Sequence, residues 1–171
     1  METLPLFTEV YGDQLDTILG NNKLLDTGYF ITLRFRQTSK RNHDQYINSS
    51  LVDENIRWFV HFASGYCIGR QYKNPKKSER KKKLKHFMVI HENNNDVFKT
   101  HCHGIIFKPE KLSGDEFRDK IISSWLKTDF GTIGNGDKMF DYQKVYSRGV
   151  VNYIFTEDQK YYDSYGASIS I

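Results

Sequence analysis

The chain has 171 residues, of which 38% are hydrophobic and 15% aromatic, and it carries a net charge of +4. This composition suits one domain with a hydrophobic core, expected here over residues 1–171, and excludes an intrinsically disordered chain. No apolar run reaches the length of a membrane span, the first residues lack a signal-peptide pattern, and two cysteines are too few for a disulfide framework. We therefore expect an intracellular protein without a membrane partner.

The first half of the chain predicts a strand, a helix and a hairpin. Residues 28–36 alternate in polarity and are rich in aromatic and β-branched side chains, which indicates a strand. Ser50, with Asp53 three residues later, opens an apolar stripe at helical spacing. Residues 85–92 and 97–107 are two further strands, and the Asn-rich turn between them predicts an antiparallel hairpin.

The second half predicts a helix, a glycine-rich loop, a strand and a last helix. Ser113 and Glu116 have capping-box spacing before an apolar pattern, residues 139–146 suit a strand, and Ser147 begins a helix expected over residues 147–162. A central hairpin excludes an all-parallel sheet. The expected fold class is therefore α+β, with a central antiparallel β-sheet flanked by helices.

Positive charge is concentrated in residues 70–85, which contain nine Lys or Arg residues and one Glu. This stretch carries +8, so the rest of the chain carries −4. A basic stripe on an acidic body is typical of a polyanion contact, and the alternative is a solvated hairpin tip that lysines keep soluble. The candidate DNA-binding residues are Arg70, Lys73, Lys76, Lys77, Arg80, Lys81, Lys82, Lys83 and Lys85.

Two histidines stand two residues apart in the second strand of the predicted hairpin. Because side chains alternate along a strand, His101 and His103 share one face and Cys102 points to the other. Two imidazoles on a rigid backbone can chelate one metal ion. The neighbouring strand offers Glu92 or His91 as a third ligand, and we favour Glu92 slightly because a carboxylate suits Mg²⁺ or Mn²⁺. The remaining histidines, His43, His61 and His86, are expected at the surface or in packing.

These motifs resemble those of the HUH endonuclease superfamily. "THCHGIIF" is similar to its histidine–hydrophobic–histidine signature, "YFITLRF" to its first strand motif, and "GVVNYIFTE" to the helix that carries its nucleophilic tyrosine. The three occur in family order over roughly residues 28 to 160, and the closest subtype is the single-tyrosine rolling-circle replication initiator (Rep). The chain has no room for the helicase domain that often accompanies such a nuclease.

The resemblance implies a metal-dependent enzyme that nicks and joins single-stranded DNA of a specific sequence or hairpin. Tyr153 would be the nucleophile and would form a 5′-phosphotyrosine. Tyr146 is the next candidate. The sequence departs from the family's Tyr-x-x-Lys pattern, because Thr156 stands at the lysine position and Lys160 follows four residues later. Other tyrosines are weaker candidates that could stack on bases, namely Tyr142, Tyr161, Tyr162 and Tyr165.

The resemblance also implies the biological setting. The expected partner is single-stranded DNA at the replication origin of a plasmid or virus, with a host polymerase or helicase as further partners. The expected compartment is the host cytoplasm, or the nucleus for a eukaryotic virus. A relaxase or a single-strand transposase with the same chemistry is an alternative. A non-catalytic single-strand-binding module would explain the basic stretch but not the histidine pair.

Overall fold

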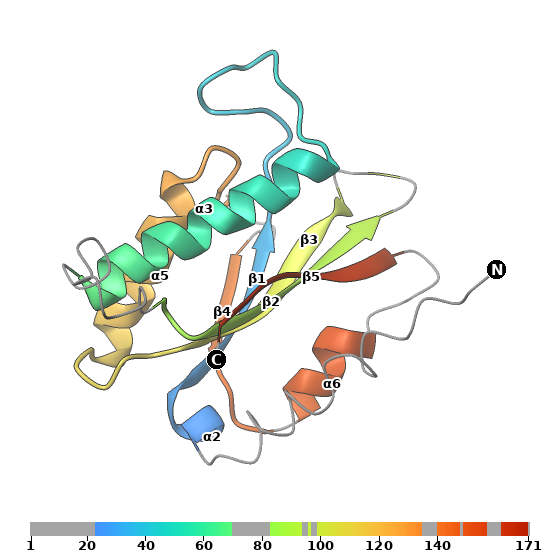
Figure 1. The fold of residues 1–171 in the computed structure, drawn as a ribbon. Helices are drawn as coiled ribbons and strands as arrows, with labels where there is room; N and C mark the ends of the chain where they lie inside the picture. The colour runs from blue at the N-terminus through green and yellow to red at the C-terminus, as the bar shows by residue number, and fades with distance from the viewer. Residues whose placement is uncertain are drawn as a thin grey trace, which may run out of the picture.

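A computed structural model describes residues 23–69, 83–93, 96, 99–134, 140–147, 149–156 and 162–170 (Figure 1). The described elements, in chain order, are α2 (Lys23–Thr27), β1 (Gly28–Arg34), α3 (Ser49–Ile68), β2 (His86–Asn93), β3 (His101–Phe107), α5 (Gly114–Lys127), β4 (Phe140–Lys144), α6 (Gly149–Thr156) and β5 (Tyr162–Ser170). The strands form one sheet in the order β4-β1-β3-β2-β5, and every neighbouring pair is antiparallel. The predicted α+β fold with an antiparallel sheet and flanking helices is confirmed.

Both long helices begin with side-chain caps. The Asn48 side chain accepts a hydrogen bond from the Leu51 amide, so α3 starts slightly before the predicted Ser50. At α5, Ser113 and Glu116 form the predicted capping box, in which each side chain bonds the other residue's backbone amide. Such caps satisfy amide groups that have no partner inside the helix.

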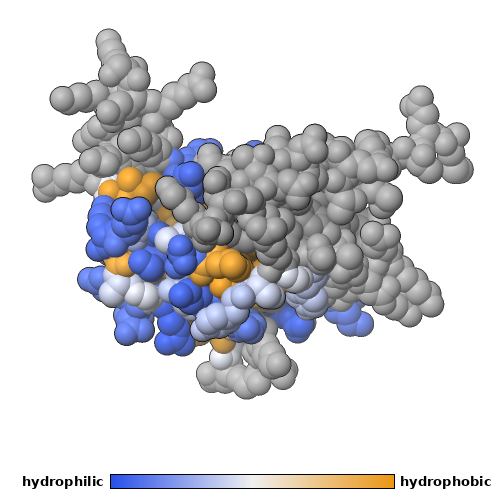
Figure 2. Space-filling model, turned by 90° about the horizontal axis from the view of Figure 1, so that it is seen from below, coloured by the Kyte–Doolittle hydropathy of each residue, from blue (hydrophilic) through white to orange (hydrophobic). Residues whose placement is uncertain are grey.

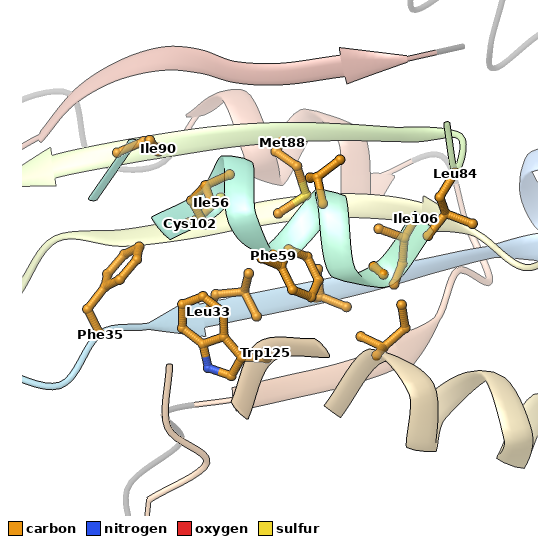
Figure 3. Close-up of a cluster of buried hydrophobic side chains, with 14 of the residues drawn as sticks. Leu33, Phe35, Ile56, Phe59, Leu84, Met88, Ile90, Cys102, Ile106 and Trp125 are labelled. Carbon is orange, nitrogen blue, oxygen red and sulfur yellow. The ribbon is translucent and has the colours of Figure 1, made fainter. Parts of the chain in front are cut away.

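One face of the sheet packs against α3 and α5 to make the hydrophobic core. Figure 3 shows Ile56 and Phe59 of α3 and Trp125 of α5 gathered with Leu33 and Cys102 from the strands. All of these side chains are buried, and replacing a buried aromatic ring by Ala typically costs about 3–5 kcal/mol of stability. The core therefore fixes the register of the strands, because a slip of one residue would turn these side chains to the opposite face.

The opposite face of the sheet carries the strand side chains that point away from the core. It presents Phe30 and Thr32 from β1, His91 from β2, and His101 and His103 from β3, at the positions that alternate with the core residues. Helix α6 packs on this face, where the Tyr153 ring contacts Phe30 and His103. Figure 1 accordingly shows α3 and α6 on opposite sides of the sheet.

The structure differs from the sequence predictions in its helices and strands. The helix predicted over residues 147–162 ends at Thr156, and the chain then forms β5, an edge strand that was not predicted. The short helix α2 before β1 was also not predicted. A side chain at Gly104 would overlap the Met88 side chain on the core face, so this glycine allows close packing inside the sheet.

No helix in the described part of the chain has the length and apolarity needed to cross a membrane. On the face shown in Figure 2, hydrophilic residues cover most of the described surface and the hydrophobic residues form small separate patches. This face therefore offers no broad apolar area within the described residues.

His86 predicts a pH dependence of folding. The pKa of His86 is lowered from its ordinary 6.5 to about 4, mainly by burial; the hydrogen bond to the Leu84 carbonyl opposes this shift, and the nearby Lys83 charge adds a smaller lowering. Because the unfolded chain binds this proton more readily, the free energy of unfolding should fall as pH drops through 6.5 and level off below about 4. A shift of this size corresponds to roughly 3 kcal/mol.

Urea unfolding of the wild type and of His86→Gln at pH 7 and pH 4 measures this contribution. The wild type should lose roughly 3 kcal/mol more than the variant on acidification. An equal loss in both proteins would assign the acid sensitivity to other groups.

Candidate active site

Three histidine side chains lie together on the sheet face that α6 covers. In the β2–β3 ladder His91 stands directly opposite His101, and His103 follows two residues later on the same face. All three are buried. The ring centroids are 5.2 Å apart for His91 and His101, 5.1 Å for His91 and His103, and 4.8 Å for His101 and His103. The predicted pair is thus part of a three-histidine cluster.

Tyr153 lies beside this cluster. Its ring centroid is 5.3 Å from that of His103 and 6.0 Å from that of Phe30. The next residue, Ile154, is fully buried and anchors α6, whereas 51% of Tyr153 is exposed. The phenol therefore combines a contact with the histidine cluster with access to solvent, as a nucleophile for a large substrate requires.

The structure does not place Glu92 with the histidine pair. Glu92 follows His91 in β2 and points to the opposite face, where its carboxylate accepts a hydrogen bond from the Ser49 hydroxyl at the start of α3. The structure thus corrects the expected place of Glu92, and His91 is the residue that lies beside His101 and His103; the identity of the third ligand stays a prediction. The reason is the hairpin register, which pairs His91 with His101.

The spacing of the three rings suits one shared metal ion. An ion about 2.1 Å from each ligating nitrogen lies roughly 3 Å from each ring centre, which puts the centroids of ligating rings about 5 Å apart. Within the described residues, however, no three His, Cys, Asp or Glu side chains form a ready-made metal site. The His91 and His101 rings are stacked within 21° of parallel. Because imidazole lone pairs lie in the ring plane, one of these two rings must rotate before both can reach the same ion.

Both predicted histidines are held through Nδ1. His101 Nδ1 lies 3.0 Å from the Lys99 carbonyl oxygen, and His103 Nδ1 lies 3.0 Å from the Thr32 hydroxyl. Such hydrogen bonds orient histidine ligands in metal sites and leave Nε2 as the ligating nitrogen. Thr32 and Phe30, which contact His103, were missed by the sequence analysis. The alternation of residues 28–36 was the available signal, since it places both side chains on one face.

The other candidate tyrosines have different settings. Tyr146 is 82% exposed. Tyr142 stacks on Tyr29 on the core side of the sheet, with ring centroids 4.8 Å apart, and burial raises the pKa of its hydroxyl well above the ordinary value of 10.0. A phenol that resists ionisation and faces the core is a poor nucleophile. Tyr162 and Tyr165 lie on β5, whose side chains the structure does not describe, and Tyr161 and Lys160 lie outside the described residues.

Most of the basic stretch also lies outside the described residues, namely Arg70, Lys73, Lys76, Lys77, Arg80, Lys81 and Lys82. Lys83 and Lys85 are described and exposed. Between them Leu84 is buried, and its amide donates to the Ser64 hydroxyl of α3. The stretch therefore joins the sheet at the start of β2, about 17 Å along the strand from His91. The three remaining histidines match expectation, since His43 and His61 are exposed and His86 is packed.

A cavity of about 310 Å³ lies between the first turns of α3 and the segment after α5. Its buried polar groups bond to one another, because the Asn55 side chain bonds both the Thr128 hydroxyl and the Phe130 amide. The Asp129 carboxylate likewise accepts from the Ser39 hydroxyl at 2.6 Å. These bonds join the segment after α5 to α3 and to the loop that contains Ser39, so the groups hold these parts of the fold together.

The imidazole nitrogens and the phenol oxygen determine which chemistry this arrangement allows. Three buried imidazoles can hold a divalent transition ion, and a half-exposed phenol beside them can attack an electrophile bound there. All four of these side chains lie at the sheet face that α6 covers. Comparison of the chain with protein-family models, with curated proteins and with solved structures finds no match.

Proposed function

We propose that this protein is a metal-dependent endonuclease that nicks and rejoins single-stranded DNA through Tyr153. The observation that carries the proposal is the half-exposed Tyr153 ring, 5.3 Å from His103 in a cluster of three buried histidines. Tyr153 lies 50 residues after His103 in the chain, so their closeness results from the fold and not from their positions in the sequence. Their proximity supports the proposal that the motifs resembling those of HUH endonucleases form one active site.

His91, His101 and His103 would hold the divalent ion. When bound, such an ion polarises the oxygens of the scissile phosphate. The predicted ions were Mg²⁺ and Mn²⁺. With His91 in place of Glu92 the ligand set has no carboxylate among the described residues, and imidazole ligands bind Mn²⁺ better than Mg²⁺. Mn²⁺ is therefore the ion to use in the first assays.

Tyr153 would exchange one phosphodiester for another. A bond forms between its phenolic oxygen and phosphorus, the bond from phosphorus to the 3′ oxygen breaks, and that oxygen leaves with a proton that replaces the one lost by the phenol. Because no water is consumed, the bond energy is kept and a 3′-hydroxyl can reverse the step. Phe30 packs beside the tyrosine ring and would limit its orientation.

This chemistry suits the initiation of rolling-circle replication of a plasmid or virus. The released 3′-hydroxyl can prime a polymerase, and the retained 5′ end allows the finished strand to be rejoined. In this role the protein would act in the host cytoplasm, or in the nucleus of a eukaryotic host, together with a host polymerase or helicase.

The test is a covalent adduct. The wild-type protein, incubated with a pool of single-stranded hairpin oligonucleotides and Mn²⁺, should gain a nucleotide mass on the peptide that contains Tyr153. Binding of the oligonucleotides without any adduct, across the whole pool, would favour the non-catalytic single-strand-binding module.

The basic stretch gives a separate prediction about DNA binding. Replacing lysines among residues 76–85 by Gln should weaken binding to all single strands by a similar factor, because lysine–phosphate interactions carry no sequence information. Each lysine that no longer neutralises a phosphate should reduce the slope of log affinity against log salt by roughly 0.7. Arg118→Gln, an exposed change on α5, is the matched control. An unchanged slope in the lysine variants would identify the stretch as a solvated loop.

A further inference from the structure

Thr32 and His103 are directly opposite each other in the β1–β3 ladder. The Thr32 hydroxyl oxygen lies 3.0 Å from His103 Nδ1, and both side chains are buried. The contact joins residues 71 positions apart in the chain and lies between two central strands of the sheet. It therefore sets the orientation of the His103 ring through rigid backbone rather than through a loop.

The two ligand histidines have chemically different partners. The Lys99 carbonyl can only accept, so His101 Nδ1 must carry a proton and donate it, and Nε2 then bears the lone pair. A hydroxyl can both donate and accept. Thr32 can therefore bond His103 in either neutral tautomer, by donating to a bare Nδ1 or by accepting from a protonated one.

We propose that Thr32 is a positioning residue, which acts through His103 to present Nε2 of that ring to the metal ion of the proposed function. In this proposal the Thr32 hydroxyl donates to Nδ1 in the metal-free protein, and the His103 proton is on Nε2. An ion bound at Nε2 would require the His103 proton at Nδ1, and the Thr32 hydroxyl would then accept it. His101 thus already has the tautomer that an ion at Nε2 needs, whereas His103 would exchange tautomers on binding.

The side chain at position 32 can be changed with little disturbance of the sheet. Val has the shape of Thr and favours strands, so Thr32→Val removes the hydroxyl and retains the packing beside Phe30. Thr32→Ser retains the hydroxyl and removes the methyl group. Ser124→Ala on α5 is a matched control, because it removes a buried hydroxyl that bonds the Lys120 carbonyl of its own helix.

Calorimetry with Mn²⁺ tests the positioning role. Loss of a hydrogen bond to a ligating histidine typically weakens metal binding about 10- to 100-fold. Thr32→Val should show such a loss, while Thr32→Ser and Ser124→Ala should stay within about threefold of the wild type. Equal affinity of wild type and Thr32→Val would overturn the proposal, as would a Thr32→Ser variant as weak as Thr32→Val.

Nitrogen-15 NMR of the histidine rings tests the tautomers without any activity assay. In the metal-free wild type, His101 should carry its proton on Nδ1 and His103 on Nε2. Addition of Zn²⁺, which is diamagnetic, should move the His103 proton to Nδ1, and Thr32→Val should alter the metal-free signals of His103 alone. Identical His103 signals in wild type and Thr32→Val would overturn the assignment.

The same experiments separate this inference from the proposed function. If the wild type binds neither Mn²⁺ nor Zn²⁺, the metal site itself is wrong and both proposals fall. If the wild type binds metal and forms the Tyr153 adduct while Thr32→Val behaves identically, the nuclease stands and only the role of Thr32 is lost.

Discussion

Tyr153→Phe should abolish both cleavage and the covalent protein–DNA adduct, with a rate loss of at least about 1,000-fold. The change deletes one oxygen, the proposed nucleophile, and keeps the ring that contacts Phe30 and His103. Stability should change by less than about 0.5 kcal/mol, because the residue is half exposed. Binding of Mn²⁺ and of single-stranded DNA should persist, since neither needs the hydroxyl. The readouts are mass spectrometry of the adduct and gel analysis of a labelled oligonucleotide.

Tyr146→Phe is the matched control. Tyr146 lies seven residues earlier and is 82% exposed, so its variant should retain nearly full activity. An adduct that survives in Tyr153→Phe but disappears in Tyr146→Phe would move the nucleophile to Tyr146. An adduct in both variants would indicate a third tyrosine.

The second large effect is expected from two neighbouring residues of β2. His91→Ala should weaken Mn²⁺ binding by roughly 100-fold or more, because it removes one of the three proposed ligands. Glu92→Ala should leave the affinity within about threefold, because its side chain faces α3. His101→Ala and His103→Ala should match His91→Ala and should also abolish metal-dependent cleavage.

Calorimetry on the pair of variants decides the third ligand, and thermal unfolding checks that each variant is folded. Glu92→Ala should change stability by less than about 0.5 kcal/mol, because the bond to the Ser49 hydroxyl is exposed and water can replace the carboxylate. A Glu92→Ala protein that binds Mn²⁺ more weakly than His91→Ala would show that the hairpin register differs in the metal-bound state.

The third ligand illustrates what a sequence cannot determine alone. The spacing of His101 and His103 predicts that they share a face, because that follows from alternation within one strand. Whether His91 or Glu92 joins them depends on the register between two strands, and a shift of one residue exchanges the two. The register is fixed by packing of Met88, Ile90 and Cys102 against α3, which no local pattern reveals.

The fold was predictable where local chemistry specifies it. The Ser113–Glu116 capping box starts α5 as expected, and the central hairpin was recognised from its turn residues and alternation. Strand β5 was missed, because the sequence "YDSYGASIS" is rich in small polar residues and lacks clear alternation. Its strand state comes from pairing with the whole length of β2, which is a tertiary effect.

Helix α6 lies between β4 and β5 in the chain, and these are the two edge strands of the sheet. The four steps between the strands amount to roughly 19 Å, of which an eight-residue helix covers about 12 Å. Tyr153, the fifth residue of that helix, consequently stands over the middle strands. Its ring contacts the side chains of Phe30 on β1 and His103 on β3. In the proposed reaction the attached 5′ end would stay above β3 while the free end departs, and any strand that is to be joined must be delivered to that spot.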